Sequence, residues 1–543
     1  MVLQKIPKFV YDILLAAFLC FPIIFSPSSK LLGSPDIDVW NHAWGPWWWS
    51  QTLLHGELPW ETTYLHWPNG GVLWYIDPVM ALLGAPLALI HPALAYNFVL
   101  VFYIAFASWA IRKFAKTLGA DNYTEWFASL AFATSGWIMS EVHNGISEAV
   151  NIGPAALAFA WIEQACRNQN RKLTNWLWAG LGVGICFLAS PYLGIGVGLA
   201  ALIRGLPDIK YAWAGALSAL PLAVLPVWIL QNQLDAENAI IKRPPGMNEE
   251  LALHNAVDPR TFIAPFGFQS RDLTEEGFLH TMYLGIVALF LTLWGFRKHR
   301  WWLLSFLLCM VCSLGPFLYW GDGWVAIGDA KLRLPWWYLQ QAVPSLAITH
   351  PLRIAVPCLA IVSGVAAAEL ARYKWFAYRH WFLLGALLDN LLICQPPWPL
   401  QTASGEFPEI YQQVKADPRD VGVLDLPTDV GMKFITSRYL YWQAAHGKGI
   451  PYAPDARANT SSLLRSNYFL DLANQCQLRK GVKLPPSSRG WRQTADIKRD
   501  KIGWIIVHEQ LDPLTAPRLI QILREKLGEP TVTTESATAW KIE

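Results

Sequence analysis

Long apolar segments alternate with short polar stretches along the first 394 residues. Such segments cover residues 9–25, 93–111, 124–140, 149–165, 174–205, 211–230, 279–296, 301–318, 351–371 and 376–394. One membrane-crossing helix needs about 20 predominantly apolar residues. Residues 174–205 are long enough for two crossings, which would meet at Ser190-Pro191-Tyr192. The pattern predicts an α-helical polytopic membrane protein with about 11 transmembrane helices.

Between Pro78 and Ile111 the apolar stretch is too long for one crossing, and Pro86 and His91-Pro92 interrupt it. The first loop is expected outside and the basic residues after Ile111 are expected inside, so an odd number of crossings must lie between them. The stretch is too short for three, which leaves one. We therefore expect an interfacial or re-entrant helix at residues 79–91 and a crossing at 93–111.

Basic residues cluster after every second segment. The clusters include Arg112, Lys113 and Lys116, then Arg167, Arg171 and Lys172, and the run Arg297–Arg300. Basic loops remain cytoplasmic under the positive-inside rule. The N-terminus is then cytoplasmic, and no A-x-A-like cleavage site follows the first segment. A first loop (34–78), the turn 141–148 and the loops 231–278 and 319–350 share the outer face with the tail.

The tail, residues 395–543, is more polar than the membrane domain, residues 1–394. Residues 421–426 and 504–507 have the continuous apolar pattern of buried strands. Residues 516–527 form an amphipathic pattern that ends at Gly528, a residue typical of helix C-caps, and 531–542 can form a last hairpin. The tail is predicted to be a soluble α/β or α+β domain.

Composition agrees with a membrane protein, because 53% of the residues are hydrophobic and only 15% are charged. A soluble domain carries about 25% charged residues. The formal charge of +3 and the lack of a long basic run argue against nucleic acid as a partner. Most of the eight cysteines lie in apolar segments, with no disulfide or zinc pattern.

The first outer loop carries the strongest candidate chemistry. Asp36 and Asp38 open it and are followed by five tryptophans, Trp40, Trp44, Trp47, Trp48 and Trp49. Carboxylates beside aromatic rings suit a sugar, and one acid can act as the general base for an acceptor hydroxyl. The other can bind the acceptor or a divalent metal. The alternative is that both acids only solvate the loop or cap a helix.

Further candidates for substrate binding lie on the same face. Trp40 and His42 belong to the first loop, and Asp77 either orients that loop or caps a helix that begins at Pro78. The outer turn contains His143, Asn144 and Glu148. Ionisable groups at a membrane boundary indicate function when they face the helix bundle, although a crossing also needs a polar turn.

Outer-face cations are candidates for binding a phosphate. Arg353 lies just inside the apolar segment 351–371, and Lys242 and Arg243 lie in the long loop. A guanidinium matches phosphate oxygens, whereas an arginine that snorkels from a span end is the alternative. The sequence has no glycine-rich nucleotide loop, so a lipid-phosphate donor fits better than a nucleotide sugar.

Together these features resemble the GT-C superfamily of polytopic glycosyltransferases, and a large bacterial group within it. The motifs that carry the resemblance are DVWNHAW…WW (38–49), PNGG…IDP (68–78), HNGISE (143–148), LRIAVP (352–357), VLDLP (423–427), YWQAAHGKG (441–449) and IGWIIVHEQL (502–511). The resemblance implies an inverting enzyme of the bacterial inner membrane with a periplasmic tail. It implies Asp38 as the base and Arg353 as the ligand of a polyprenyl phosphate.

The chain departs from better-known branches of that superfamily. It lacks the Asp-Glu pair of the protein O-mannosyltransferases and the WWD-type tail motif of the oligosaccharyltransferases. Acceptor and metal use therefore do not carry over. The expected partners are a polyprenyl-phosphate sugar donor, membrane lipid and a glycan, lipid or protein acceptor.

Two other functions remain open from the sequence. A lipid or glycan transporter would have paired charges or internal repeats around a midplane site, whereas here the polar residues gather on one face. A non-catalytic GT-C-like scaffold, or a subunit of a membrane complex, would use the tail as its docking module.

Overall fold

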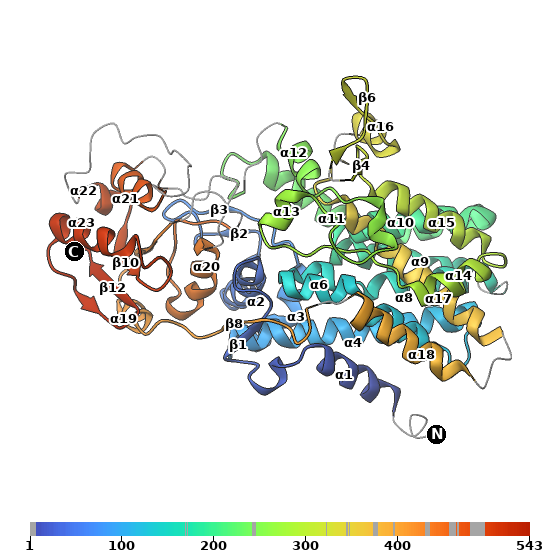
Figure 1. Cartoon of the computed structure of the whole chain (residues 1–543). Helices are drawn as coiled ribbons and strands as arrows, with labels where there is room; N and C mark the ends of the chain where they lie inside the picture. Colours follow the sequence, from blue (N-terminus) through green and yellow to red (C-terminus); the bar gives the residue numbers. More distant parts are fainter. Residues whose placement is uncertain are drawn as a thin grey trace.

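An elongated body of helices and a smaller C-terminal tail make up the molecule (Figure 1). This mostly helical chain with a C-terminal sheet agrees with the predicted helical body and mixed tail, and the count of about 11 crossings stays a prediction. The computed structural model describes residues 7–168, 170, 172–241, 246–321, 323–343, 346, 348–372, 378–394, 397–428, 435–454, 463, 466–477 and 495–543.

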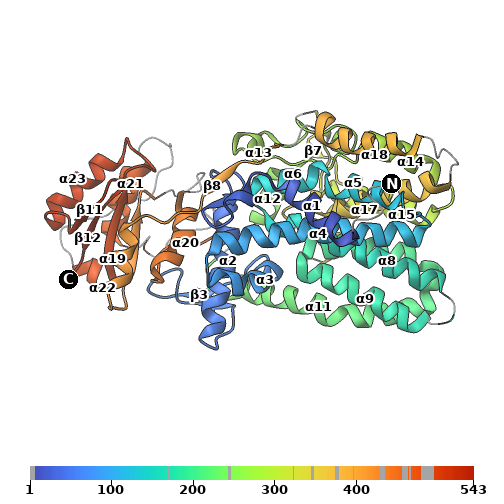
Figure 2. The ribbon, with the colours of Figure 1, turned by 90° about the horizontal axis from the view of Figure 1, so that it is seen from below.

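Helix α4 (Pro92–Leu118) runs through the middle of the body. It contacts helices that are far apart in the sequence: α1 (Lys8–Leu19), α5 (Glu125–Ala133), α8 (Gly153–Arg167) and α17 (Val356–Arg372). Beyond α8, Figure 2 shows α9 (Lys172–Ala189) and α11 (Ile209–Asp235) side by side. Other helices of the body are α10 (Pro191–Gly205), α14 (Ile286–Gly295), α15 (Arg300–Ser313) and α18 (Arg379–Leu388).

Four helical segments of the described chain are long and apolar enough to cross a membrane: Pro92–Leu118, Lys172–Ala189, Pro191–Gln233 and Pro351–Arg372. The third is 43 residues long and joins α10 to α11, about twice what one crossing needs. Helix α11 also exposes large apolar side chains, among them Trp213, Leu217, Val224 and Trp228. Exposed apolar surface of this extent suits a lipid environment.

Several predicted boundaries agree with the structure. Helix α9 ends at Ala189 and α10 begins at Pro191, so the predicted break at Ser190 is confirmed. The predicted helix at 79–91 is α3 (Pro78–Ala88). The two long loops that are predicted to be outer contain short elements. The loop 231–278 contains α12 (Met247–His254) and α13 (Arg271–Glu275), and the loop 319–350 contains β4 (Tyr319–Trp320), β5 (Gly323–Trp324), β6 (Ala326–Ile327), β7 (Ala330–Lys331) and α16 (Pro335–Ala342).

One prediction about the outer face is wrong. Residues 124–140 do not form one helix that ends in a polar turn, because α5 stops at Ala133 and α6 (Gly136–Asn144) begins after Ser135. The Ser135 side chain accepts a hydrogen bond from the Ile138 amide, and Gly145, with φ of 74°, ends α6. These two caps place the polar residues of the expected turn on a buried helix, followed by α7 (Ser147–Val150).

Arg167, from one of the basic clusters, and Arg204 of α10 meet at the end of the body that is remote from the tail. Glu163 on α8 forms ion pairs with Arg167 and with Arg204 on α10, and it accepts a hydrogen bond from the Trp302 indole on α15. In Figure 1 the N-terminus lies at this end, and the tail lies at the other. The body therefore has a basic end and a tail end.

The tail is built on a four-stranded sheet with the order β11-β12-β10-β9. Strands β9 (Gly422–Leu426) and β10 (Ile502–His508) are parallel and buried, and β11 (Val532–Thr533) and β12 (Ala537–Lys541) form an antiparallel hairpin. Helix α23 (Ala516–Leu527) ends at Gly528. These strands, the helix and its C-cap confirm the predictions for this part of the chain.

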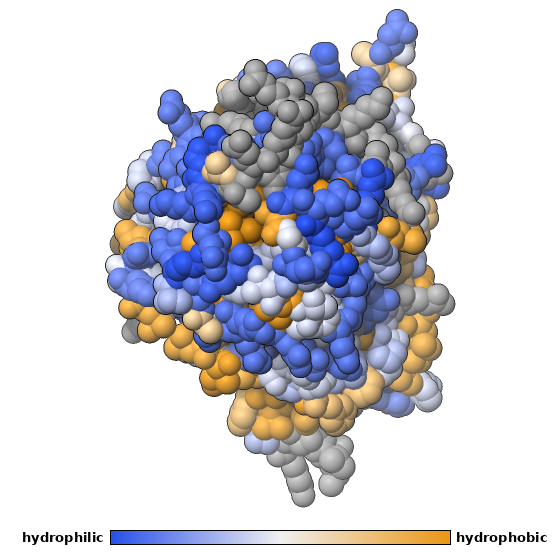
Figure 3. Space-filling model, turned by 90° about the vertical axis from the view of Figure 1, so that its left-hand side faces the viewer, coloured by the Kyte–Doolittle hydropathy of each residue, from blue (hydrophilic) through white to orange (hydrophobic). Residues whose placement is uncertain are grey.

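Contacts with the first loop join the tail to the body. Strand β1 (Lys30–Leu32), just after α1, pairs with β8 (Thr402–Ser404). Helix α20 (Ile435–His446) of the tail packs on α2 (Val39–Leu54) of the first loop, and Trp44 donates a hydrogen bond to Gln443 at 2.9 Å. The face of the tail that points away from the body is mostly hydrophilic (Figure 3).

Candidate functional site

Asp36 and Asp38 lie where the first loop meets the body, immediately before α2. The Asp36 side chain is 82% exposed and is 3.5 Å from the Arg438 guanidinium of α20. Asp38 is half-buried at the N-terminus of α2, and its side chain makes no capping hydrogen bond to the helix. The capping alternative therefore does not account for Asp38.

A chain of buried polar contacts begins one turn farther along α2, at His42. Its Nδ1 is 2.9 Å from the Ser147 hydroxyl and 3.6 Å from a Glu148 oxygen. The other Glu148 oxygen accepts a hydrogen bond from Nη1 of Arg353 at 2.5 Å. Burial lowers the pKa of His42, and the Glu148 charge opposes that shift. Three elements distant in sequence thus bring His42, Glu148 and Arg353 together.

Asp77 extends this chain and also caps a helix. Its carboxylate accepts hydrogen bonds from the Met80 amide at 2.9 Å, from the Tyr103 hydroxyl at 3.1 Å and from the Ser147 hydroxyl at 2.6 Å. Burial raises its pKa to about 7, although these hydrogen bonds act in the opposite direction. Capping of α3, one of the two roles expected for Asp77, is therefore present together with a link to the buried chain.

Helix α6 contributes a second set of polar contacts, made by Glu141 and Asn144, beside the contacts of His42, Glu148 and Arg353. Glu141 contacts Nδ1 of His280 at 2.8 Å. Asn144 exchanges two hydrogen bonds with the backbone of Leu279, at 2.7 and 2.9 Å. Nδ1 of the buried His143 has no hydrogen-bond partner among the described residues. Asn144 thus fixes residues 279–280 next to α6.

The tryptophans of α2 are mostly interior. Trp44 and Trp48 are fully buried and stacked on each other, and Trp40 and Trp47 are 2% and 5% exposed. The Trp40 indole donates to the Pro35 carbonyl, and the Arg438 guanidinium lies 5.3 Å from its ring. These rings support the first loop and the tail contact, so they offer little surface on which a sugar can stack.

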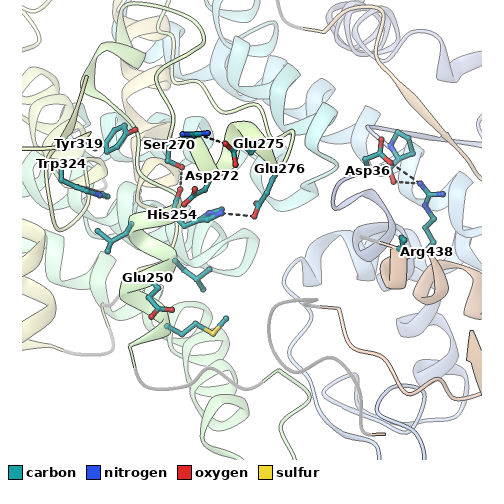
Figure 4. A pocket seen from close by; sticks show the side chains of 16 residues that line it. Asp36, Glu250, His254, Ser270, Asp272, Glu275, Glu276, Tyr319, Trp324 and Arg438 are labelled. Carbon is teal, nitrogen blue, oxygen red and sulfur yellow. Dashed lines mark hydrogen bonds and ion pairs between the residues drawn. The ribbon is translucent and has the colours of Figure 1, made fainter. Parts of the chain in front are cut away.

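A cleft of about 1240 Å³ opens at this end of the body (Figure 4). Asp36 and Arg438 line one side, and α12 and α13 line the opposite side. Residues Tyr319 and Trp324 of the second outer loop complete the wall. The exposed carboxylate of the first loop therefore faces a space large enough for a sizeable ligand.

Two of the predicted phosphate ligands, Lys242 and Arg243, lie outside the described residues. The described residues contain no group of three or more His, Cys, Asp or Glu side chains arranged to hold a metal ion. Asp36 and Asp38 thus lack a third ligand in this part of the chain, and the possible divalent metal remains a prediction.

Several residues of the site are absent from the sequence-based candidates. Ser147 and Tyr103 hold Asp77, His280 contacts Glu141, and Arg438 reaches Asp36 from the tail. Tyr192 lies under Arg353, with its ring 5.6 Å from the guanidinium. The predicted outer break at Ser190-Pro191-Tyr192 pointed to the Tyr192 position, but no local signal pointed to Arg438 or His280.

Comparisons with known proteins relate the whole architecture to membrane transferases. ArnT of Cupriavidus metallidurans, solved with undecaprenyl phosphate, superposes with a TM-score of 0.52 at 10% identity, over 98% of this chain and 96% of that one. Arabinofuranosyltransferase AftD from Mycobacteria superposes with a TM-score of 0.51 at 14% identity, over 98% of this chain and 39% of that one. The chain has a GT-C fold.

A third GT-C structure, the Archaeoglobus fulgidus oligosaccharyltransferase, has a TM-score of 0.48 at 13% identity, over 93% of this chain and 69% of that one. No protein-family model and no curated protein sequence matches the chain. The predicted GT-C resemblance is thus confirmed at the level of the fold, which holds the first-loop acids and Arg353 at the tail end of the body.

Proposed function

We propose that the chain is a membrane glycosyltransferase that moves a sugar from a polyprenyl-phosphate-linked donor to an acceptor at the tail end of the body. The observation that carries the proposal is Asp36 on the cleft, in a GT-C fold that holds the buried Arg353 at the same end. The undecaprenyl phosphate bound by ArnT, which shares the fold, supports a lipid-linked donor.

In this mechanism a first-loop carboxylate, Asp38 or Asp36, accepts the proton of an acceptor hydroxyl. The acceptor oxygen then bonds to the anomeric carbon of the donor sugar. The bond between that carbon and the phosphate oxygen breaks, and polyprenyl phosphate leaves with the electron pair. Attack on the face opposite the phosphate inverts the anomeric configuration. Positioned proton transfer of this kind contributes about 10²–10⁴-fold in rate.

Arg353 is the proposed ligand of the donor phosphate. Glu148 occupies its Nη1, while its buried Nε has no hydrogen-bond partner among the described residues. A buried donor without a partner costs about 1–3 kcal/mol, and a phosphate oxygen would satisfy it. Glu148 then fixes the guanidinium, and charge that develops on the leaving phosphate is stabilised.

The proposed topology places about 11 crossings in the bacterial inner membrane, with the tail in the periplasm. It is supported by Arg167 and Arg204, which meet at the end remote from the tail. Under the positive-inside rule that end is cytoplasmic. The tail and the cleft then share the periplasmic side, where a polyprenyl-linked sugar can be used without a nucleotide.

Mass spectrometry of lipid carriers and surface glycans tests the transfer. Cells carry the wild type, a deletion, Asp36→Asn, Asp38→Asn or the double variant. We expect the deletion and at least one Asp→Asn variant to lose one sugar from a glycan and to accumulate its lipid-linked donor. The variant with the larger loss identifies the base.

Glu57→Gln is the matched control, because Glu57 is an exposed acid of the same loop that does not line the cleft. It should leave the glycan unchanged. A glycan lost in the deletion but retained in the double Asp→Asn variant would reject catalysis and favour the scaffold or the transporter.

A further inference from the structure

The walls of the cleft come from distant parts of the chain. Helix α12 contributes Met247, Glu250 and Leu251, and α13 with its flanking residues contributes Ser270, Asp272 and Glu276. The first loop and α20 of the tail form the opposite wall (Figure 4). With a volume of about 1240 Å³, the cleft exceeds the ~300–1,000 Å³ typical of a small-molecule pocket. It therefore has room for a ligand longer than one sugar unit.

Carboxylates dominate the polar lining of this cleft. Among the described lining residues, the acids are Asp36, Glu250, Asp272, Glu275 and Glu276, and the guanidinium groups are Arg271 and Arg438.

Each basic group of the lining is already matched with an acid. Arg271 pairs with Glu275 at 2.6 Å, Arg438 with Asp36 at 3.5 Å, and His254 with Glu276 at 3.2 Å.

Glu250 and Asp272 have no cationic partner in the described part of the chain. An ionised carboxylate only accepts hydrogen bonds. The lining therefore favours a ligand rich in hydrogen-bond donors and disfavours an anion.

An aromatic surface lies at the other side of α12. Trp324 is half-buried, and its ring meets the buried Tyr319 edge to face at 5.2 Å. The Lys331 ammonium lies 5.2 Å from the centre of the Trp324 ring. The Gly321 amide beside them donates to Asp258 at 2.8 Å, and Arg260 binds the same carboxylate. These contacts thus connect the aromatic pair, Tyr319 and Trp324, to the loop 231–278.

We propose that this cleft is the acceptor site and that the acceptor is a saccharide that is neutral or carries amines, without carboxylate or phosphate groups. The assignment rests on the transfer proposed above. The acceptor packs the apolar face of one sugar ring on Trp324, and its hydroxyls donate to Glu250 and Asp272. The reacting hydroxyl points toward Asp36, the first-loop acid that lines this cleft.

A saccharide fits this lining better than a peptide or a lipid. Every ring offers several hydroxyl donors to the carboxylates, whereas a peptide unit offers one amide hydrogen. A flat indole face matches the C–H groups of a pyranose and loses little conformational entropy on binding. A lipid chain requires an open and purely apolar lining. The acidic side chains of this cleft make its lining unsuitable for such a chain.

Saturation-transfer NMR on the full chain in lipid nanodiscs, with polyprenyl phosphate present, tests the assignment. The probes are neutral tetrasaccharides of glucose, galactose, mannose and arabinose, a glucosamine tetramer, a galacturonate tetramer and an uncharged Ser/Asn tetrapeptide. We expect a neutral or amine-bearing saccharide to bind and the galacturonate tetramer not to bind. Trp324→Ala should weaken saccharide binding about tenfold, the upper range for an aromatic contact.

Matched controls separate these effects from general damage. Trp320→Ala removes a neighbouring exposed tryptophan outside the cleft and should leave binding unchanged. Glu250→Gln with Asp272→Asn should admit the galacturonate tetramer. Glu529→Gln with Glu535→Gln, two exposed acids of the tail, removes the same charge and should not admit it.

Four results would overturn the assignment: no saccharide binds the wild type, the galacturonate tetramer binds equally well, the peptide binds more tightly, or Trp324→Ala leaves binding unchanged. Transfer in cells together with any of these rejects the acceptor site alone. Saccharide binding that depends on Trp324, in a protein without transfer, rejects the transferase function alone.

Discussion

Arg353 and Glu148 form a buried ion pair, at 2.5 Å, in the centre of the candidate site. Both side chains are at most 8% exposed. Taking two charges out of water is expensive, and the loss of one partner leaves the other uncompensated. Each member of the pair is therefore expected to matter for stability, apart from the role in phosphate binding proposed for Arg353.

Glu148→Gln should destabilise the protein by about 3 kcal/mol or more, because Arg353 remains charged and buried. Glu148→Gln with Arg353→Met should cost less than the sum of the two single variants, since the double variant leaves no unpaired charge. Thermal unfolding of the full chain in detergent measures both. Additive losses would mean that the two side chains do not depend on each other.

His446 provides a pH-dependent contribution to the stability of the tail. Burial lowers its pKa to about 4, compared with about 6.5 in an unfolded chain. The folded state thus resists protonation that the unfolded state accepts. Stability is complete above pH ~6.5, falls by about 3 kcal/mol as the pH drops toward 4, and loses no more below that from this residue.

Unfolding midpoints of the wild type and His446→Asn between pH 8 and pH 4 test this contribution. Asparagine keeps an acceptor for the Lys448 amide, which donates to Nδ1 of His446 at 3.1 Å, but does not titrate. The wild type should lose about 3 kcal/mol of stability relative to His446→Asn as the pH falls from about 6.5 to 4. Parallel curves across the whole range would contradict the assignment.

At the scale of residues, the sequence predicted acids and cations but not their partners. Asp36, Asp38, Glu148 and Arg353 stood out because charges beside apolar segments are rare. The partner of Arg353 could not be predicted, since the pairing depends on how α7 packs against the 3-10 turn Pro351–Ala355 that precedes α17. Roles in catalysis for these residues stay predictions.

At the scale of elements, the first loop forms the surface on which the tail packs. Trp67 donates its amide to the Ile450 carbonyl and its indole to the Lys501 carbonyl, both at 3.0 Å. A Cβ atom on Gly422 or Gly449 would lie 2.2 Å from the Trp67 ring. The ring therefore needs glycine on both tail segments that it contacts.

Gly449→Ala should displace Trp67 and destabilise the tail contact by about 1–3 kcal/mol, the usual cost of overpacking. Limited proteolysis of the full chain should release the tail earlier. Gly198→Ala is the control, because a Cβ there meets nothing within 4 Å. Adding Trp67→Leu should recover part of the loss if the clash is the cause, and an unchanged digestion rate for Gly449→Ala would refute it.

Prediction of elements succeeded where one local signal determined the boundary. Pro191 and Gly528 marked ends that the structure confirms. The prediction of one helix and a polar turn for residues 124–148 was wrong because the Ser135 and Gly145 caps interrupt a continuous apolar pattern. The polar side chains of the expected turn are buried and have partners such as His280 for Glu141. Hydrophobicity alone does not separate such a broken helix from one crossing.

At the scale of the whole molecule, the basic clusters and the tail lie at opposite ends. The sequence predicted this separation because loops rich in Lys and Arg lie on the cytoplasmic side under the positive-inside rule, and the tail is expected on the other side. It could not predict that α20 closes one side of the cleft, since that contact joins residues about 400 positions apart, such as Asp36 and Arg438.

Cysteine labelling tests the orientation of the two ends. The native cysteines are buried or half-buried, so they should react slowly with a charged maleimide. Glu535→Cys, on the exposed tail hairpin, should be labelled in intact spheroplasts. Lys113→Cys, at the exposed basic end, should be labelled only after the membrane is opened. The reverse pattern would overturn the topology.

The pairing of β1 with β8 also constrains when the molecule can be completed during synthesis. Lys30–Leu32 emerge early, but their partners at 402–404 follow roughly 370 residues later, which takes about 20–70 s at ordinary rates of translation. Throughout that interval the first loop lacks the strand and the tail segments that contact it in the folded molecule. The surroundings of Asp36 and Asp38 are thus completed last, so a truncated nascent chain would carry both acids without their contacts to the tail.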